Sequence, residues 1–128
     1  MTAADIKLKI PHAKPYHGIA RLVVGGLAAR LDLSYEHLDD LQLALGTVLE
    51  NDDYSTGSEV TVELRVRDEG VTVLIGPLRT RELQADLDRN GNAVSLGRLL
   101  STVVEGVEVE QRIDGGWLRF EKRVRLAT

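Results

Sequence analysis

The most constraining feature of the sequence is the stretch from Ser34 to Asn51, SYEHLDDLQLALGTVLEN, which predicts one helix of about five turns. Ser34 is a typical N-cap residue, and acidic side chains follow it, where a helix N-terminus favours negative charge. The opposite face carries Thr47 and Asn51, one turn apart, and is either solvated or one wall of a pocket. The apolar residues recur at helical spacing on a face that we expect to pack on a sheet: Leu38, Leu41, Leu45, Val48 and Leu49.

Apolar and polar residues alternate on both sides of this helix, and this pattern predicts strands. Residues 60–66 alternate most clearly, and the DEG that follows is typical of a hairpin turn into a returning strand, which Gly76-Pro77 ends. The expected elements in chain order are strand 6–10, helix 15–31, helix 34–51, strand 60–66, strand 71–75, a short helix 81–87, helix 95–104, strand 107–113 and strand 117–124. This order implies an α+β fold, a two-layer sandwich with helices on one face of a sheet.

Length and composition narrow the class of protein. The 128 residues fit one domain, 1–128, that is large enough for a real core, with 43% hydrophobic and 28% charged residues. A net charge of −4 without a long run of one sign argues against direct nucleic-acid binding. The chain has no cysteine, no apolar segment of membrane-spanning length and no signal-peptide pattern at its start. We therefore expect a cytoplasmic protein.

Common catalytic patterns are missing from the sequence. His12, His17 and His37 lack the spacing of a zinc site, and we expect them to be solvated or partly packed. The sequence contains no nucleophile elbow, no Walker A motif and no dinucleotide-binding fingerprint. The residues alone therefore indicate no enzyme class.

The order of the elements and several strings resemble one known family. DLQLALGTVLEN, VTVLIGP, and SLGRLLSTVVEGVEVE followed by GGWLRFEKRV are similar to strings of the anti-sigma-factor serine kinases. These small bacterial regulators belong to the GHKL (histidine-kinase-like) ATPase superfamily, and the resemblance spans nearly the whole chain. It implies a sandwich of the Bergerat type with a mixed sheet and helices on one face. It also implies ATP and Mg as cofactors, a homodimer, and a sigma factor and a STAS-type anti-anti-sigma protein as partners.

The family's helix motif, E-x-x-x-N, falls on Thr47 and Asn51. The resemblance implies a general base at the first position and a magnesium ligand at the second. A threonine hydroxyl is a very weak base, so Thr47 does not replace the carboxylate, whereas Asn51 keeps the metal-binding amide.

The other nucleotide motifs are altered too. The adenine-reading D-x-G-x-G falls on Leu74, Gly76 and Leu78, and a leucine at the first position offers adenine no hydrogen bond. The phosphate-side G-x-G appears as Ser95-Leu96-Gly97, whose alternative interpretation is an ordinary helix cap by Ser95. Residues 79–94 correspond to the lid and are shorter and poorer in glycine than the resemblance implies.

These departures predict a member of this fold with lost or weak kinase activity. The first hypothesis is an anti-sigma-factor-like binding protein that acts in partner switching. The second is an active ATP-dependent serine/threonine kinase that phosphorylates a STAS-type partner. The third is a pseudo-ATPase domain whose pocket holds an unrelated ligand.

Overall fold

The computed structural model describes residues 3–88 and 95–125. Its five strands form one sheet in the order β1-β2-β3-β5-β4. The strands are β1 (Ala4–Pro11), β2 (Glu59–Arg67), β3 (Gly70–Leu78), β4 (Glu105–Arg112) and β5 (Gly115–Arg123). The helices are α1 (His17–Arg30), α2 (Tyr35–Leu49), α3 (Thr80–Asp88) and α4 (Leu96–Val103), with short 3₁₀ turns η1 (Lys14–Tyr16) and η2 (Asp52–Tyr54).

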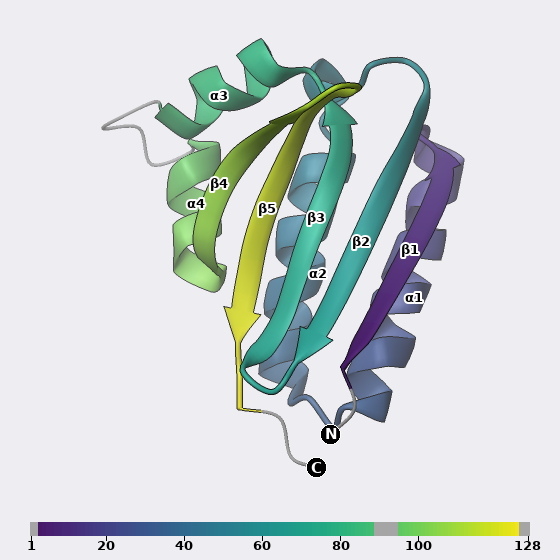
Figure 1. The fold of residues 1–128 in the computed structure, drawn as a ribbon, viewed down its shortest axis with the longest axis vertical. Coiled ribbons are helices and arrows are strands. Elements are labelled where there is room, and N and C mark those ends of the chain that lie inside the picture. Colours follow the sequence, from purple (N-terminus) through teal and green to yellow (C-terminus); the bar gives the residue numbers. More distant parts are fainter. Residues whose placement is uncertain (1–2, 89–94, 126–128) are drawn as a thin grey trace.

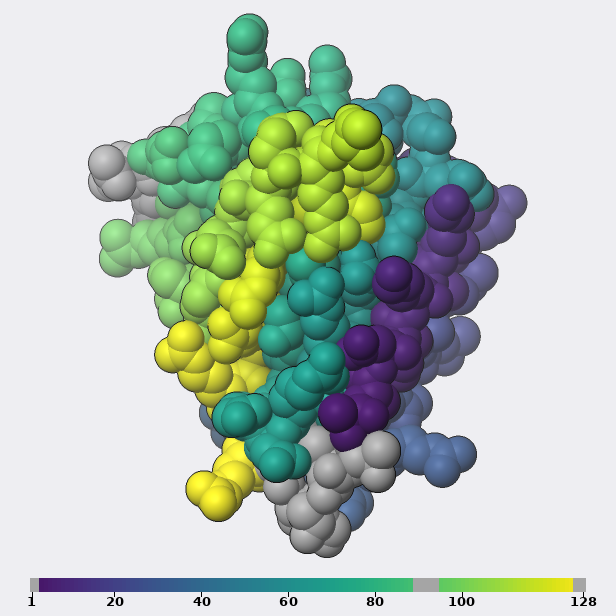
Figure 2. Space-filling model, viewed as in Figure 1, coloured from purple at the N-terminus to yellow at the C-terminus, as the bar shows by residue number. Residues whose placement is uncertain are grey.

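The helices lie on one side of the sheet. Figure 1 shows α1 and α2 behind the strands, with α4 beside α2 behind β4, and α3 near the end of β3. In the part of the chain that the structure describes, no helix covers the other face, and Figure 2 shows its strands at the surface from β1 to β4. The predicted two-layer α+β sandwich with helices on one face is therefore confirmed.

The core lies between the sheet and α2. Leu41, Leu45, Val48 and Leu49 of this helix are all buried, as the helical spacing predicts. On the sheet side, buried residues come from alternate positions of the strands, such as Val62 and Leu64 in β2 and Val73 and Ile75 in β3. Burial of these apolar faces against each other is what holds the two layers together.

The structure differs from the predictions in the pairing of the strands. Within the described residues every strand pairing is antiparallel, so the predicted mixed sheet is wrong in this respect. The reason is that β2–β3 and β4–β5 are hairpins, whose strands must be antiparallel, while α1 and α2 return the chain so that β1 also runs antiparallel to β2.

Two predicted boundaries also change. Strand β3 continues past Gly76-Pro77 to Leu78. Pro77 has no N–H to donate to the ladder, and the register with β5 shifts between Ile75 and Leu78. Pairing then resumes at Leu78. Helix α2 ends at Leu49, so the prediction that it includes Asn51 is wrong. The predicted short helix in the lid-equivalent region is confirmed as α3, whereas residues 89–94 of that region lie outside the described residues.

Candidate functional site

Thr47 and Asn51, the residues at the E-x-x-x-N positions, both make local backbone contacts. The Thr47 hydroxyl donates a 2.7 Å hydrogen bond to the carbonyl of Leu43, one turn earlier in α2. Asn51 has extended backbone angles, and its side-chain oxygen accepts a 3.0 Å hydrogen bond from the Asp53 N–H to cap η2. Asparagine is a favoured cap because its short side chain reaches this N–H. Asn51 therefore lies just beyond the end of α2, whereas Thr47 lies within it.

Leu74 and Gly76 lie on the sheet face that points away from the helices. Leu74 is opposite Glu63 in β2 and Arg119 in β5, and directly opposed residues share a face. Gly76 lies under the indole of Trp117: a Cβ added there would be 2.4 Å from the ring carbon Cδ2. The glycine is therefore explained by packing against the tryptophan, on the face opposite to α2.

Ile75 is the β3 residue that faces the helices at this level of the sheet. It is fully buried in the core together with Val73, whose side chain points the same way. The sequence analysis missed this residue, because the apolar Leu74 beside it hides the one available signal, the even spacing of Ile75 from Val71 and Val73. An adenine placed between α2 and β3 would thus contact Ile75, which, like a leucine, offers no hydrogen bond.

Ser95, Leu96 and Gly97 form the start of α4. The Ser95 hydroxyl accepts a 3.3 Å hydrogen bond from the Arg98 N–H, which is the helix-cap role given above as the alternative. Leu96 is buried in the core, and a Cβ added to Gly97 would lie 2.6 Å from the carbonyl oxygen of Leu87. Helix α3 therefore approaches the start of α4 so closely that only glycine fits there.

Core side chains from α3 and from η2, the turn that follows α2, are buried together. Leu83 of α3 is fully buried, and Tyr54 of η2 is 1% exposed. The Tyr54 hydroxyl donates a 2.6 Å hydrogen bond to the carboxylate of Asp86 in α3. These contacts hold α3 against η2.

ATP with magnesium does not fit the predicted residues as this structure arranges them. Leu74 faces the other side of the sheet from α2, and α3 packs against Gly97 at the start of α4. Among residues 3–88 and 95–125, no group of three or more histidine or acidic side chains could hold a metal ion.

A cleft of about 730 Å³ opens elsewhere, between α3, α4 and β4. Ser95 and Gly97 belong to its lining, whereas Thr47, Asn51 and Leu74 do not. Its walls mix half-buried valines of β4 with polar side chains of the two helices, including Gln84 and Arg98. The structure therefore brings together the phosphate-side residues and separates them from the other predicted positions.

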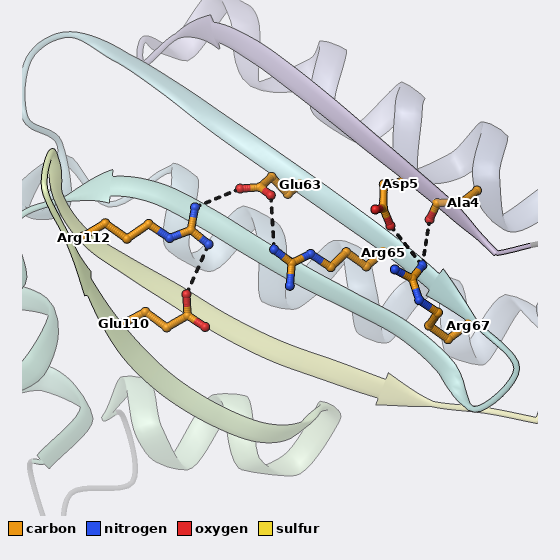
Figure 3. A network of polar contacts seen from close by, with 7 residues as sticks. All are labelled: Ala4, Asp5, Glu63, Arg65, Arg67, Glu110 and Arg112. Atoms are coloured by element: carbon orange, nitrogen blue, oxygen red, sulfur yellow. Dashed lines mark hydrogen bonds and ion pairs between the residues drawn. The ribbon is translucent and has the colours of Figure 1, made fainter.

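The helix-free face of the sheet carries a network of ion pairs, which Figure 3 shows over β1, β2 and β4. The nearly buried Glu63 accepts a 3.0 Å hydrogen bond from Arg112 and lies 3.5 Å from a guanidinium nitrogen of Arg65. Burial disfavours the charged form of Arg112, but its hydrogen bonds to Glu63 and Glu110 outweigh this effect and raise its pKa above the ordinary value. Arg112 also stacks 4.0 Å from the centre of the Trp117 ring.

The fold is an antiparallel α+β sandwich, which is consistent with the histidine-kinase-like ATPase type. No protein-family model matches the chain. The chain is similar to three curated proteins named serine-protein kinase RsbW. The one from Oceanobacillus iheyensis is 39% identical over 36% of this chain and 29% of that protein. The one from Bacillus velezensis is 32% identical over 58% and 50%, and the one from Bacillus pumilus 27% identical over 82% and 77%.

The chain thus spans less than a third of the first of these proteins, half of the second and about three quarters of the third. The similarity to proteins named serine-protein kinase agrees with the resemblance drawn from the sequence. In the part of the chain that the structure describes, no helix is both long and apolar enough to cross a membrane.

Proposed function

We propose that the protein is an anti-sigma-factor-like regulator of the GHKL superfamily that has lost most or all of its kinase activity. In this proposal it binds a sigma factor, a STAS-type anti-anti-sigma protein or both, and acts as a homodimer in the cytoplasm. Support comes from the two-layer fold and from the similarity to three serine-protein kinases, one of them over 82% of this chain. In this proposal the partners bind to surfaces outside the nucleotide pocket, so partner binding can be retained when kinase activity is lost.

One observation carries the proposed loss of activity: the two positions that need a carboxylate have none. Thr47 stands at the general-base position, and its hydroxyl donates to the Leu43 carbonyl. At the adenine-reading position, Leu74 points away from α2, and Ile75, which points toward it, is equally apolar. A kinase with this arrangement would lack both the proton acceptor and the hydrogen bond that selects adenine.

Two measurements test the proposal separately. Titration calorimetry with ATP and Mg²⁺ should detect no binding in the low-micromolar range. Affinity capture with the tagged full chain from its native host should recover a sigma factor or a STAS protein. A low-micromolar dissociation constant would contradict the loss of nucleotide binding, and a capture that reproducibly contains neither partner would contradict the regulatory role.

The second candidate is an active serine/threonine kinase, and the name serine-protein kinase, which the three relatives share, favours it. Transfer of labelled phosphate from ATP to the captured STAS protein would establish it. In that case Asn51→Ala should abolish the transfer, because Asn51 is the one metal-binding group of the motif that remains. Asn51→Asp is the matched control, since an aspartate can both bind magnesium and cap η2.

A third candidate is a pseudo-ATPase domain with a different ligand, which the cleft between α3, α4 and β4 favours. If it is correct, the ligand should protect the Ser101 and Val107 amides from hydrogen exchange. A host metabolite extract that leaves these amides unprotected would count against this candidate.

A further inference from the structure

His12 and His17, which are close in the sequence, lie together at the end of α2. His12 follows β1, and His17 begins α1; their ring centres are 5.8 Å apart, with the rings inclined at 64°. The Nε2 atom of His12 lies 3.0 Å from the carbonyl oxygen of Leu49, the last residue of α2. This contact joins the connection between β1 and α1 to the C-terminal end of α2.

The buried polar atoms of this pair are poorly satisfied. His17 is 6% exposed, and among the described residues neither of its ring nitrogens has a hydrogen-bond partner. The Nδ1 atom of His12 is also buried without a partner. Because a carbonyl only accepts, His12 must donate from Nε2, so its Nδ1 carries a lone pair in the neutral ring. Neutral His17 buries one donor and one acceptor without a partner, and a charged ring would be far more costly to bury.

The charges around His17 come from every neighbouring element. Burial lowers the pKa of His17 most, and His12 and Arg21 of α1 lower it further. Glu50 at the end of α2 and Asp52 of η2 act in the opposite direction. Glu50 is already bound to Arg21 by a 2.7 Å ion pair, which limits the help it can give to a charged imidazole. The environment as a whole therefore favours neutral His17.

We propose that His12, His17 and the Leu49 carbonyl form an acid-sensitive latch that holds the start of α1 against the end of α2. At neutral pH the His17 ring is neutral and the latch is closed. When His17 takes up a proton, its charge is solvated only if the ring leaves the core, so the start of α1 moves away from α2. This local opening is independent of any partner and goes beyond the function proposed above.

The direction of the pH effect follows from proton linkage. The pKa of His17 is lower in the folded protein than its ordinary value of 6.5, so the opened form binds the proton more tightly. The closed form therefore loses stability as the pH falls through 6.5 toward the folded pKa, and the loss is complete below it. Above 6.5 neither form is protonated, and the latch is insensitive to pH.

Hydrogen exchange of the intact chain tests the latch. Protection of residues 17–20 and 48–50, corrected for intrinsic rates, should be constant between about pH 7.5 and about pH 6.5. Between about pH 6.5 and about pH 5.5 it should fall by up to tenfold per pH unit. His17→Leu fills the same space without a titrating group, and it should make this protection independent of pH. His37→Gln, at the third histidine, is the matched control and should behave as the wild type does.

Two outcomes would overturn the latch: unchanged wild-type protection across this range, or the same fall in His17→Leu. The wild-type protein gives a second test that needs no variant. The ring protons of His17 should titrate by nuclear magnetic resonance with a midpoint below 6.5, together with the loss of protection. A midpoint at or above 6.5 would contradict the proposal, because a proton would then stabilise the closed form.

Discussion

Replacing Gly76 by alanine tests whether this glycine serves the nucleotide or the packing of Trp117. The added Cβ would lie 2.4, 2.5 and 2.7 Å from three carbons of the indole, whereas carbon atoms normally approach to about 3.5–4.0 Å. One of the two groups must therefore move by about 1 Å. Two contacts hold the ring in place: its Nε1 donates a 2.9 Å hydrogen bond to Asp114, and Arg112 stacks on its face. The backbone of Gly76 is held within the sheet, opposite Thr61.

We expect Gly76→Ala to lower the free energy of unfolding by about 2 kcal/mol, the middle of the range for overpacked sites. For a chain of this length, that change lowers the melting temperature by about 7 °C. Urea denaturation followed by circular dichroism measures the free energy, and the fluorescence of Trp117, the single tryptophan of the chain, reports the local change.

The double variant tests whether the contact with the indole causes the loss of stability. In the Trp117→Val background this contact is absent, so adding Gly76→Ala should lower the free energy of unfolding by less than about 0.5 kcal/mol. Gly26→Ala is the control for a tolerated methyl: it is exposed in α1 with nothing within 4 Å of the added Cβ, and should stabilise by up to about 1 kcal/mol. An unchanged stability of Gly76→Ala, or the same loss with and without the indole, would refute the packing argument.

Substitutions at three further positions test the contacts that fix the helices. Lys122→Met should lower the free energy of unfolding, measured by urea denaturation, by about 2 kcal/mol. The reason is that the Lys122 amine donates hydrogen bonds to Asp40 (2.7 Å) and to the Val103 carbonyl (2.8 Å). A loss below about 0.5 kcal/mol would mean that water replaces the amine. Ser95→Ala should lower the free energy of unfolding by about 1 kcal/mol, because the cap of α4 is lost. Ser95→Asp should lower it much less, since an aspartate can also cap the helix, and equal losses would argue against a capping role. Leu83→Ala should cost about 2–4 kcal/mol if α3 is part of the core, and an unchanged melting temperature would show that it is not.

Much of the fold was predictable because its signals are local. The alternation in residues 60–66 and the DEG turn identify β2 and the β2–β3 hairpin from neighbouring residues alone. Helix α2 follows in the same way from its apolar spacing and from Ser34, whose hydroxyl accepts from the His37 N–H. The candidate site was less predictable, because its residues come from separate elements.

Leu74 illustrates the difficulty. It is fully buried, but it lies beneath the charged network on the helix-free face. An apolar residue beside an apolar residue hides the strand's alternation, so the sequence does not say which of Leu74 and Ile75 faces the helices. Gly97 has the same ambiguity, since a glycine required by α3 and a glycine required by a phosphate look alike in the sequence.

The sequence by itself determined the element order, the hairpins, the capped helices and the absence of a carboxylate at position 47, because each of these depends on residues within a few positions of one another. The tertiary structure decided which face of the sheet Leu74 and Gly76 occupy, that α3 covers the start of α4, and that His12 and His17 meet at the end of α2. These features depend on the register between strands and on the packing of distant helices. Both are set by the burial of the whole core, to which residues from every part of the chain contribute.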